Sequence, residues 1–202
     1  MTAPREREAI LRCQDGDVAG LEVLFELHRA SVLRTAYGIV GRRQLAEDVT
    51  QQVFVELFTA MRRFDPERPL APWLYRIVVN ISLKELRRRH HRTLPLDEVA
   101  ADLPSLDPLP DLIAEESEVK RSMWTAIQSL SPKHRAAVVL RYYHGFSEAE
   151  MAVALGCRRG TVKSRLHSAL RQLEVLLRES GIPERVLERE RDAAVTCDAV
   201  QP

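Results

Sequence analysis

Residues 147–177 read SEAEMAVALGCRRGTVKSRLHSALRQLEVLL, and this stretch decides the fold of the C-terminal half. Ser147 followed three residues later by Glu150 is the signature of a capping box, which starts a helix. Gly156 supplies a helix stop, after which apolar residues recur every three to four positions to the end of the stretch. The stretch therefore predicts two helices joined by a tight turn, the helix-turn-helix arrangement.

The second helix of this pair has one apolar side and one polar, cationic side. At 100° per residue, Val162, Leu166 and Ala169 share a side and are expected to be buried. The turn and the opposite side supply hydrogen-bond donors and cations suited to DNA: Arg158, Arg159, Thr161, Lys163, Ser164, Arg165, His167 and Arg171. Such a helix fits the major groove, where Arg and Lys donate to guanine acceptors. A charged helical hairpin without a DNA role is the alternative.

The rest of the chain also has the periodicity of helices, because apolar residues recur at three and four positions without sustained alternation. Asp17 can cap a helix that Gly41 ends. Ser131-Pro132 places an N-cap before a proline at the first helical position. Further helices are expected over residues 42–63, 72–91, a segment ending at 130, and 132–143. The sequence therefore predicts an all-α fold.

Charge and proline divide the chain into two domains. Residues 93–119 contain eight acidic residues and no lysine or arginine, and they hold four prolines. Proline fixes φ and lacks an N–H donor, so this segment cannot form a continuous helix. We predict a first domain at 1–92, an acidic linker at 93–110, a second domain at 111–179, and a tail of unknown role at 180–202.

The helix expected over residues 72–91 has a basic stripe that includes one large aromatic ring. Around Trp73, within about 60°, lie Arg76, Ile77, Asn80, Lys84, Arg87, Arg88 and His91. Leu74, Tyr75 and Val78, on the other side, are expected in the core together with Val79 and Leu86. Cations suit phosphates, the amide can read a base edge, and the ring can stack on an unpaired base for about 1–3 kcal/mol. A solvated basic face with Trp73 in the core is the alternative.

The helix expected over residues 42–63 has a broad apolar face and an outward patch with little charge. The apolar face comprises Val49, Val53, Phe54, Leu57, Phe58 and Met61. The outward patch comprises Asp48, Gln51, Gln52, Val55 and Thr59. Amides around an outward valine favour a protein interface, and an ordinary solvated surface is the alternative.

Several classes of protein are excluded by what the sequence lacks. Apolar runs fall far short of the roughly 18 residues of a membrane span, and the charged start is unlike a signal peptide. We therefore expect a cytoplasmic protein without membrane insertion. Cys13, Cys157, Cys197 and the six histidines show no metal-ligand or disulfide spacing. With no Gly-rich phosphate loop and no nucleophile beside a matching base, we expect no enzyme activity, no metal and no cofactor.

Three strings, in this order, resemble the bacterial sigma factors of the sigma-70 family, in the small two-domain extracytoplasmic-function (ECF) group. Residues 46–54, AEDVTQQVF, resemble region 2.2, and residues 63–80 resemble regions 2.3 and 2.4. Residues 130–166 resemble region 4. The order and separation of the strings make the resemblance specific, and it covers about residues 14–178. Gln52 and Met151 depart mildly from the family pattern, where Glu and Ile are common.

The resemblance implies a transcription initiation factor that binds core RNA polymerase and directs it to promoters. The outward patch would contact the β′ clamp helices. The loop before the basic stripe and the stripe itself would open and read the −10 element, through Phe64, Trp73, Arg76, Asn80, Lys84, Arg87 and Arg88. The helix-turn-helix would read the −35 element as duplex, and its domain would contact the β flap.

The resemblance implies two further contacts, and one alternative function remains. The acidic linker would thread toward the RNA-exit channel of the polymerase, and a cognate anti-sigma factor is implied. A stand-alone helix-turn-helix regulator is the alternative, because the C-terminal domain alone would fit one. Such a regulator would need neither the basic stripe around Trp73 nor the outward patch around Val55.

Overall fold

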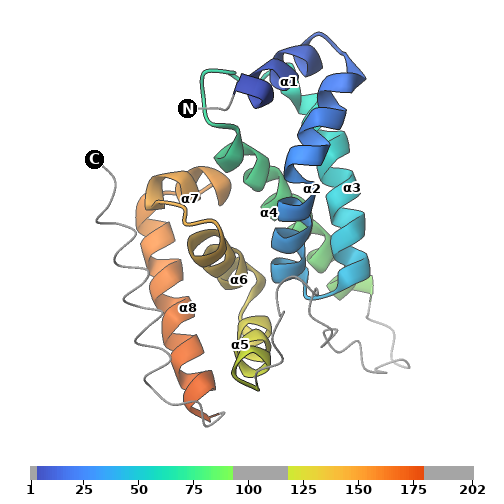
Figure 1. Ribbon diagram of the computed structural model, residues 1–202. Helices are drawn as coiled ribbons and strands as arrows, with labels where there is room; N and C mark the ends of the chain where they lie inside the picture. Colours follow the sequence, from blue (N-terminus) through green and yellow to red (C-terminus); the bar gives the residue numbers. More distant parts are fainter. Residues whose placement is uncertain (1–3, 93–117, 180–202) are drawn as a thin grey trace. The chain divides into compact units, whose positions relative to one another are not determined.

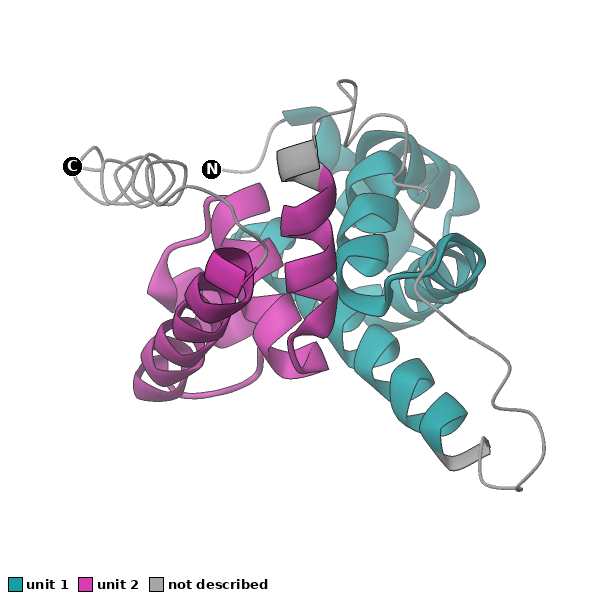
Figure 2. Cartoon of the chain, turned by 90° about the horizontal axis from the view of Figure 1, so that it is seen from below, with its two compact units in different colours: residues 1–101 teal, residues 102–202 magenta. Residues whose placement is uncertain are grey.

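The computed structural model describes the backbone of residues 4–92 and 118–179, and the side chains of 4–90 and 121–179 (Figure 1). This part of the chain is helical apart from short turns and contains no strand, which confirms the all-α prediction. Contacts divide the chain into two compact units, residues 1–101 and 102–202 (Figure 2). The predicted linker at 93–110 and tail at 180–202 lie outside the described residues, so the predicted division into four segments stays a prediction.

The first unit contains four helices: α1 (Pro4–Gln14), α2 (Val18–Val40), α3 (Arg43–Met61) and α4 (Leu70–Arg92). α2 begins as predicted, because the Asp17 carboxylate accepts a hydrogen bond from the backbone N–H of Ala19. It ends at Gly41, whose φ of 73° is a left-handed conformation that glycine adopts at little cost. α4 begins two residues before Pro72, in the first turn, where a missing N–H removes no intrahelical bond.

The core of the first unit lies between α2, α3 and α4. From α3, the predicted apolar face is buried at Val49, Val53, Phe54, Leu57 and Met61, while Phe58 is half-buried. From α4, the predicted core residues Leu74, Tyr75, Val78 and Val79 are buried, and Leu86 is half-buried. From α2, Leu24, Val32, Tyr37 and Ile39 are fully buried. The apolar spacing in the sequence therefore identified the packing faces of α3 and α4 correctly, with the exception of Ile77.

α1 was not predicted from the sequence. It buries Ala9, Ile10 and Cys13 against α2, while its three arginines and Glu8 are exposed. The contact with α2 is made at Gly20, where an added Cβ would lie 2.6 Å from the Ala9 carbonyl oxygen and 2.9 Å from the Cys13 nitrogen. The position of α1 is therefore set by the close approach of its backbone to α2, and not by a regular spacing of apolar residues.

The second unit contains α5 (Glu118–Ser129), α6 (Pro132–Val138), a π-helical turn η1 (Val139–Tyr143), α7 (Glu148–Ala154) and α8 (Arg159–Glu179). Ser131 caps α6 as predicted, by accepting from the His134 N–H. The helix predicted over 132–143 widens into the π-helical turn over its last five residues. The core joins α5, α6 and α8 through Ala126, Leu130, Val138, Ala169, Leu173 and Leu177.

The predicted capping box and turn are confirmed. The Ser147 N–H donates to Glu150 Oε2 at 2.9 Å, and the Glu150 N–H donates to Ser147 Oγ at 3.4 Å. After α7, Gly156 has a φ of 59° and reverses the chain toward α8. These local contacts fix the angle at which α8 leaves the turn, and therefore which of its residues face solvent.

Candidate nucleic-acid interface

α4 presents most of the predicted basic stripe to solvent. Its exposed members are Arg76, Asn80, Lys84, Arg87 and Arg88. Ile77 is an error of the prediction, because it is 6% exposed and lies among core residues. At 100° per residue it lies about 40° from Trp73, within the stripe, so the periodicity does not reveal its burial and only the packing of α4 does. The His91 side chain lies outside the described residues.

Trp73 and Phe64 form an aromatic pair at the start of this stripe. Their ring centroids lie 4.8 Å apart with the planes tilted by 38°. Trp73 is half-buried, while Phe64 is 6% exposed. Trp73 therefore has both a supported face and a free portion, which is the condition for stacking on a base. Phe64 has little surface to offer DNA, and its position is that of a support for Trp73.

The positive surface extends beyond the predicted residues. Arg89 is exposed beside Arg87 and Arg88 on the last turns of α4. Burial and the nearby charge of Arg89 lower the pKa of Arg42, which precedes α3. Glu85 contacts the Arg88 Nε at 3.2 Å and neutralises part of this charge. The contribution of Arg42 could not be found from the sequence, because it lies far from α4 along the chain.

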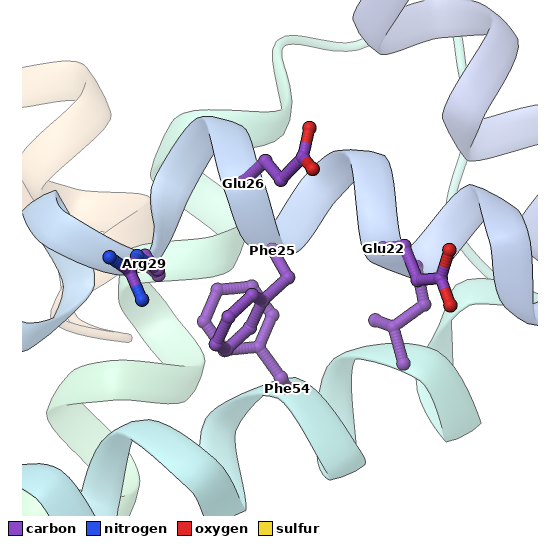
Figure 3. Close-up of a pocket in the computed structure, with 6 residues that line it drawn as sticks. Glu22, Phe25, Glu26, Arg29 and Phe54 are labelled. Carbon is purple, nitrogen blue, oxygen red and sulfur yellow. The ribbon is translucent and has the colours of Figure 1, made fainter.

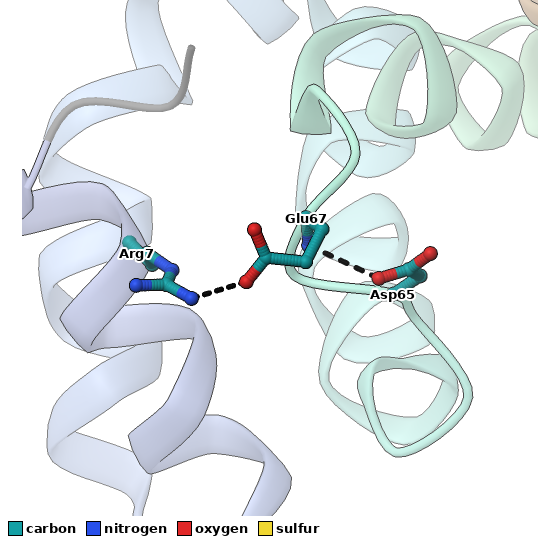
Figure 4. A network of polar contacts seen from close by, with 3 residues as sticks. All are labelled: Arg7, Asp65 and Glu67. Atoms are coloured by element: carbon teal, nitrogen blue, oxygen red, sulfur yellow. Dashed lines mark hydrogen bonds and ion pairs between the residues drawn. The ribbon is translucent and has the colours of Figure 1, made fainter.

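The loop between α3 and α4 carries carboxylates that are each paired (Figure 4). Asp65 Oδ1 accepts from the Glu67 N–H at 3.1 Å, and Asp65 Oδ2 lies 3.3 Å from the Arg68 Nε. The Glu67 carboxylate pairs with Arg7 of α1. These pairs reduce the negative charge that the loop would otherwise present next to the basic stripe.

The helix-turn-helix formed by α7 and α8 presents the predicted polar face. Val162 and Ala169 are fully buried, as the periodicity indicated. Six predicted DNA-binding residues are exposed: Arg158, Arg159, Lys163, Ser164, His167 and Arg171. Two are half-buried, Thr161 and Arg165.

Three contacts hold the start of α8 and the turn before it. The Lys163 Nζ lies 3.5 Å from Glu148 Oε2 of α7. The Ser164 hydroxyl donates to the Thr161 carbonyl. Arg165 donates to the Cys157 Sγ at 3.6 Å across the turn. The exposed Lys163–Glu148 pair is weak and can open when a phosphate approaches.

The outward patch of α3 is exposed as predicted. Asp48, Gln51, Gln52, Val55 and Thr59 all face solvent, and Val55 is 68% exposed. An isolated exposed valine needs no explanation. The neighbouring residue Phe54 lines an aromatic hollow, which the sequence did not indicate.

That hollow lies between α2 and α3 (Figure 3). It has a volume of about 600 Å³, and it is lined by Leu21, Glu22, Phe25, Glu26, Arg29 and Phe54. The Phe25 and Phe54 rings meet edge to face, with centroids 4.8 Å apart. The Phe25 ring is 38% exposed. Aromatic residues are enriched at protein interfaces, so the exposed Phe25 makes this hollow a second candidate interface of the first unit.

Two other kinds of site, for a metal ion and for a membrane, have no counterpart in the described residues. Among them, no three His, Cys, Asp or Glu residues are grouped so that they could hold a metal ion. Within the same residues, no helix is long and apolar enough to cross a membrane. The surfaces suited to binding in the described part of the chain include the cationic faces of α4 and α8, the outward face of α3, and the hollow between α2 and α3.

Comparison with known proteins identifies both units. Residues 24–92 match the family model of sigma-70 region 2, and residues 120–173 match that of sigma-70 region 4. The ECF RNA polymerase sigma factor SigL of Mycobacterium tuberculosis is 31% identical over 167 residues, which span 82% of this chain and 93% of SigL. The chain belongs to the sigma-70 family, in its ECF group. This confirms the resemblance found in the sequence, and a stand-alone regulator is not favoured.

Further relatives of this sigma factor agree. The ECF RNA polymerase sigma factor SigE of Mycolicibacterium smegmatis is 37% identical over 162 residues, which span 78% of this chain and 63% of that protein. Among solved structures, RpoE of Bartonella quintana, in complex with the anti-sigma factor NepR, has a TM-score of 0.66 at 24% identity. That comparison covers 78% of this chain and 96% of RpoE, and it shows that the fold is shared.

A second structure shares the fold. CnrH, in complex with the cytosolic domain of CnrY, has a TM-score of 0.61 at 22% identity, over 87% of this chain and 98% of CnrH. The match to sigma-70 region 2 begins within α2. α1 therefore lies outside the matched region.

Proposed function

We propose that this sigma factor binds core RNA polymerase and directs it to promoters by reading the −10 and −35 elements and assisting strand opening. The observation that carries the proposal is that one chain presents two separate cationic helical faces, on α4 and on α8, in units that match two different sigma-70 regions. Two DNA-reading units on one tether raise each other's effective concentration at a promoter that contains both elements.

At the −10 element, we assign strand opening to the start of α4. The Trp73 ring is supported by Phe64 on one side and is available to an unstacked base. Asn80 lies two turns further along the same exposed face, where its amide can both donate to and accept from a base edge. Arg76, Lys84 and the Arg87–Arg88 pair would bind the phosphates of the open strand.

At the −35 element, we assign duplex recognition to the turn and the start of α8. Arg158, Arg159 and Lys163 are exposed at the N-terminal end of the helix, the end that reaches base edges in a helix-turn-helix. Thr161 and Ser164 would add hydroxyl contacts, while Arg165, His167 and Arg171 would contact the backbone.

The outward patch of α3 is the proposed contact for the β′ clamp helices. It is formed by Asp48, Gln51, Gln52, Val55 and Thr59. The Thr59 hydroxyl donates to the Val55 carbonyl, so it offers a partner an acceptor more readily than a donor. The second unit would contact the β flap, and the acidic linker would follow the RNA-exit channel.

Regulation by a cognate anti-sigma factor is part of the proposal. RpoE of Bartonella quintana was solved with the anti-sigma factor NepR, and CnrH with the cytosolic domain of CnrY. We expect a protein of this kind to bind this sigma factor, which would act in the cytoplasm, where RNA polymerase works. We assign it no catalytic activity, no metal and no cofactor, because its role is to position DNA against the polymerase.

The test is transcription by the reconstituted holoenzyme on a library of random DNA fragments, followed by sequencing of RNA 5′ ends. We expect start sites that share two upstream motifs, near −10 and −35. Start sites without a shared motif, or no transcription beyond that of core polymerase, would contradict the proposal. On a promoter found in this way, Trp73→Ala with Asn80→Ala should leave holoenzyme assembly intact and reduce permanganate reactivity of the −10 thymines.

A further inference from the structure

α1 makes a direct contact with the loop that joins α3 to α4. The Gln14 side-chain amide donates to the Met61 carbonyl at 3.2 Å and to the Phe64 carbonyl at 2.6 Å. Met61 is the last residue of α3, and the last carbonyls of a helix lack intrahelical partners. One amide therefore ties the end of α3 to the loop residue whose ring lies against Trp73.

The contact is rigid on the α1 side. Ile10 is fully buried and Cys13 is 1% exposed, directly before Gln14. The close approach of α1 to Gly20 fixes the distance between the helix and α2. Gln14 itself is half-buried, so its hydrogen bonds are partly shielded from competing water.

A second link, from Arg7 to Glu67, joins α1 to the same loop further along the chain (Figure 4). Both side chains are more than half exposed, so this ion pair contributes little compared with the shielded Gln14 contact. The two links act on opposite ends of the loop. The Gln14 contact holds the backbone at Phe64, and the Arg7 contact holds it near the start of α4.

We infer that α1 positions the strand-opening loop and that Gln14 is its positioning residue, which holds Phe64 beneath Trp73. This inference rests on the proposed role of Trp73 in opening the −10 element. Without the Gln14 amide, Phe64 keeps only its own N–H bond to the Met61 carbonyl, at 2.9 Å, and the packing of its ring. The backbone at Phe64 is then held less firmly, and the support of Trp73 weakens. This support comes from α1, which precedes the residues that match region 2.

The test uses the full chain with Gln14→Met, which keeps the length of the side chain and removes the donor. The sequence has two tryptophans, Trp73 and Trp124, so a Trp124→Phe background makes the emission report on Trp73 alone. We expect acrylamide to quench Trp73 more strongly in the variant. In the holoenzyme, open-complex yield should fall about fivefold, which corresponds to about 1 kcal/mol, with unchanged affinity for core polymerase.

The matched control is Arg5→Ala, which removes an arginine of α1 that pairs with Glu26 of α2 and not with the loop. It should leave quenching and opening unchanged. If Gln14→Met lowers the melting temperature so far that the free protein is partly unfolded, Gln14→Asn is the second variant. Its shorter side chain keeps an amide that no longer spans both carbonyls.

The outcomes separate the inference from the proposed function. Normal opening by Gln14→Met, together with lost opening in Trp73→Ala, would overturn the inference and leave the proposed function intact. Normal opening by Trp73→Ala itself would overturn the role proposed for that ring. In that case acrylamide quenching still tests whether Gln14 holds Phe64 beneath Trp73. Unchanged quenching in Gln14→Met would show that it does not, and would overturn the inference as well.

Discussion

The cationic start of α8 leads to a quantitative prediction that requires no knowledge of the promoter sequence. Arg159 and Lys163 are both exposed, one turn apart at the N-terminal end of α8. We expect Arg159→Ala with Lys163→Ala to weaken duplex binding and to reduce its dependence on salt. Each cation that neutralises a phosphate releases condensed counterions, and this effect is independent of base sequence.

The magnitude follows from the number of charges removed. Each phosphate contact contributes about 0.9 to the slope of log affinity against log salt concentration, so two contacts contribute about 1.8. Between about 50 and 200 mM salt, the parent protein should therefore lose about twelvefold more affinity than the double variant. Glu148→Gln should instead strengthen duplex binding and increase its dependence on salt. The change frees Lys163, whose Nζ lies 3.5 Å from the Glu148 carboxylate, and removes a charge that repels phosphate.

The assay is fluorescence anisotropy of a labelled duplex of mixed sequence, titrated with the full chain at several salt concentrations. Arg178→Ala is the control for the loss of positive charge, because Arg178 lies on the same helix about 28 Å from Arg159. We expect its slope to match that of the parent. Two results would refute the placement of α8 on the duplex. One is a double variant whose salt slope equals that of the parent. The other is an Arg178→Ala variant whose slope falls by as much as that of the single variant Lys163→Ala.

Three further predictions concern the first unit. Asp48→Arg with Gln52→Ala should weaken binding to core polymerase at least tenfold, or about 1.4 kcal/mol, with duplex affinity unchanged; an unaltered dissociation constant would remove this patch from the interface. Gly20→Ala should cost about 1–3 kcal/mol in urea unfolding, because its Cβ would lie 2.6 Å from the backbone oxygen of Ala9, and a parent-like midpoint would contradict that packing. Burial raises the pKa of the Cys13 thiol, and the Asp17 charge adds to the effect, so the fold favours the neutral thiol. Its contribution to stability is complete below about pH 8.5 and is lost as the pH rises through the pKa of the folded thiol, so the parent's stability advantage over Cys13→Ala should shrink between about pH 8 and 10; a constant difference would refute it.

The parts of the fold that the sequence predicts correctly depend on contacts between near neighbours in the chain. Asp17 before α2 and the Ser147–Glu150 box before α7 act within three residues, so the residue types alone identify them. Gly41 and Gly156 mark helix ends because few other residues adopt a positive φ. The faces of α3 and α8 follow from regular apolar spacing.

The parts that the sequence misses depend on contacts between distant residues. α1 has few apolar residues and is held by a close approach at Gly20, which no local pattern reveals. Ile77 lies within the angular range of the predicted stripe, so only the packing of α4 shows that it is buried. The Gln14 contacts join residues 47 and 50 positions apart. Phe64 was predicted as a DNA contact, and the structure shows that it is buried and that its ring lies against Trp73, nine residues further along the chain.

The central claim is that this chain directs core RNA polymerase to DNA, and binding to that enzyme tests it most directly. Purified protein is mixed with core RNA polymerase that lacks any sigma factor, and the mixture is separated by size-exclusion chromatography. We predict co-elution in one-to-one stoichiometry, and the Asp48→Arg Gln52→Ala variant should elute apart from the enzyme. Separate elution of the parent protein, with duplex DNA affinity retained, would contradict the account.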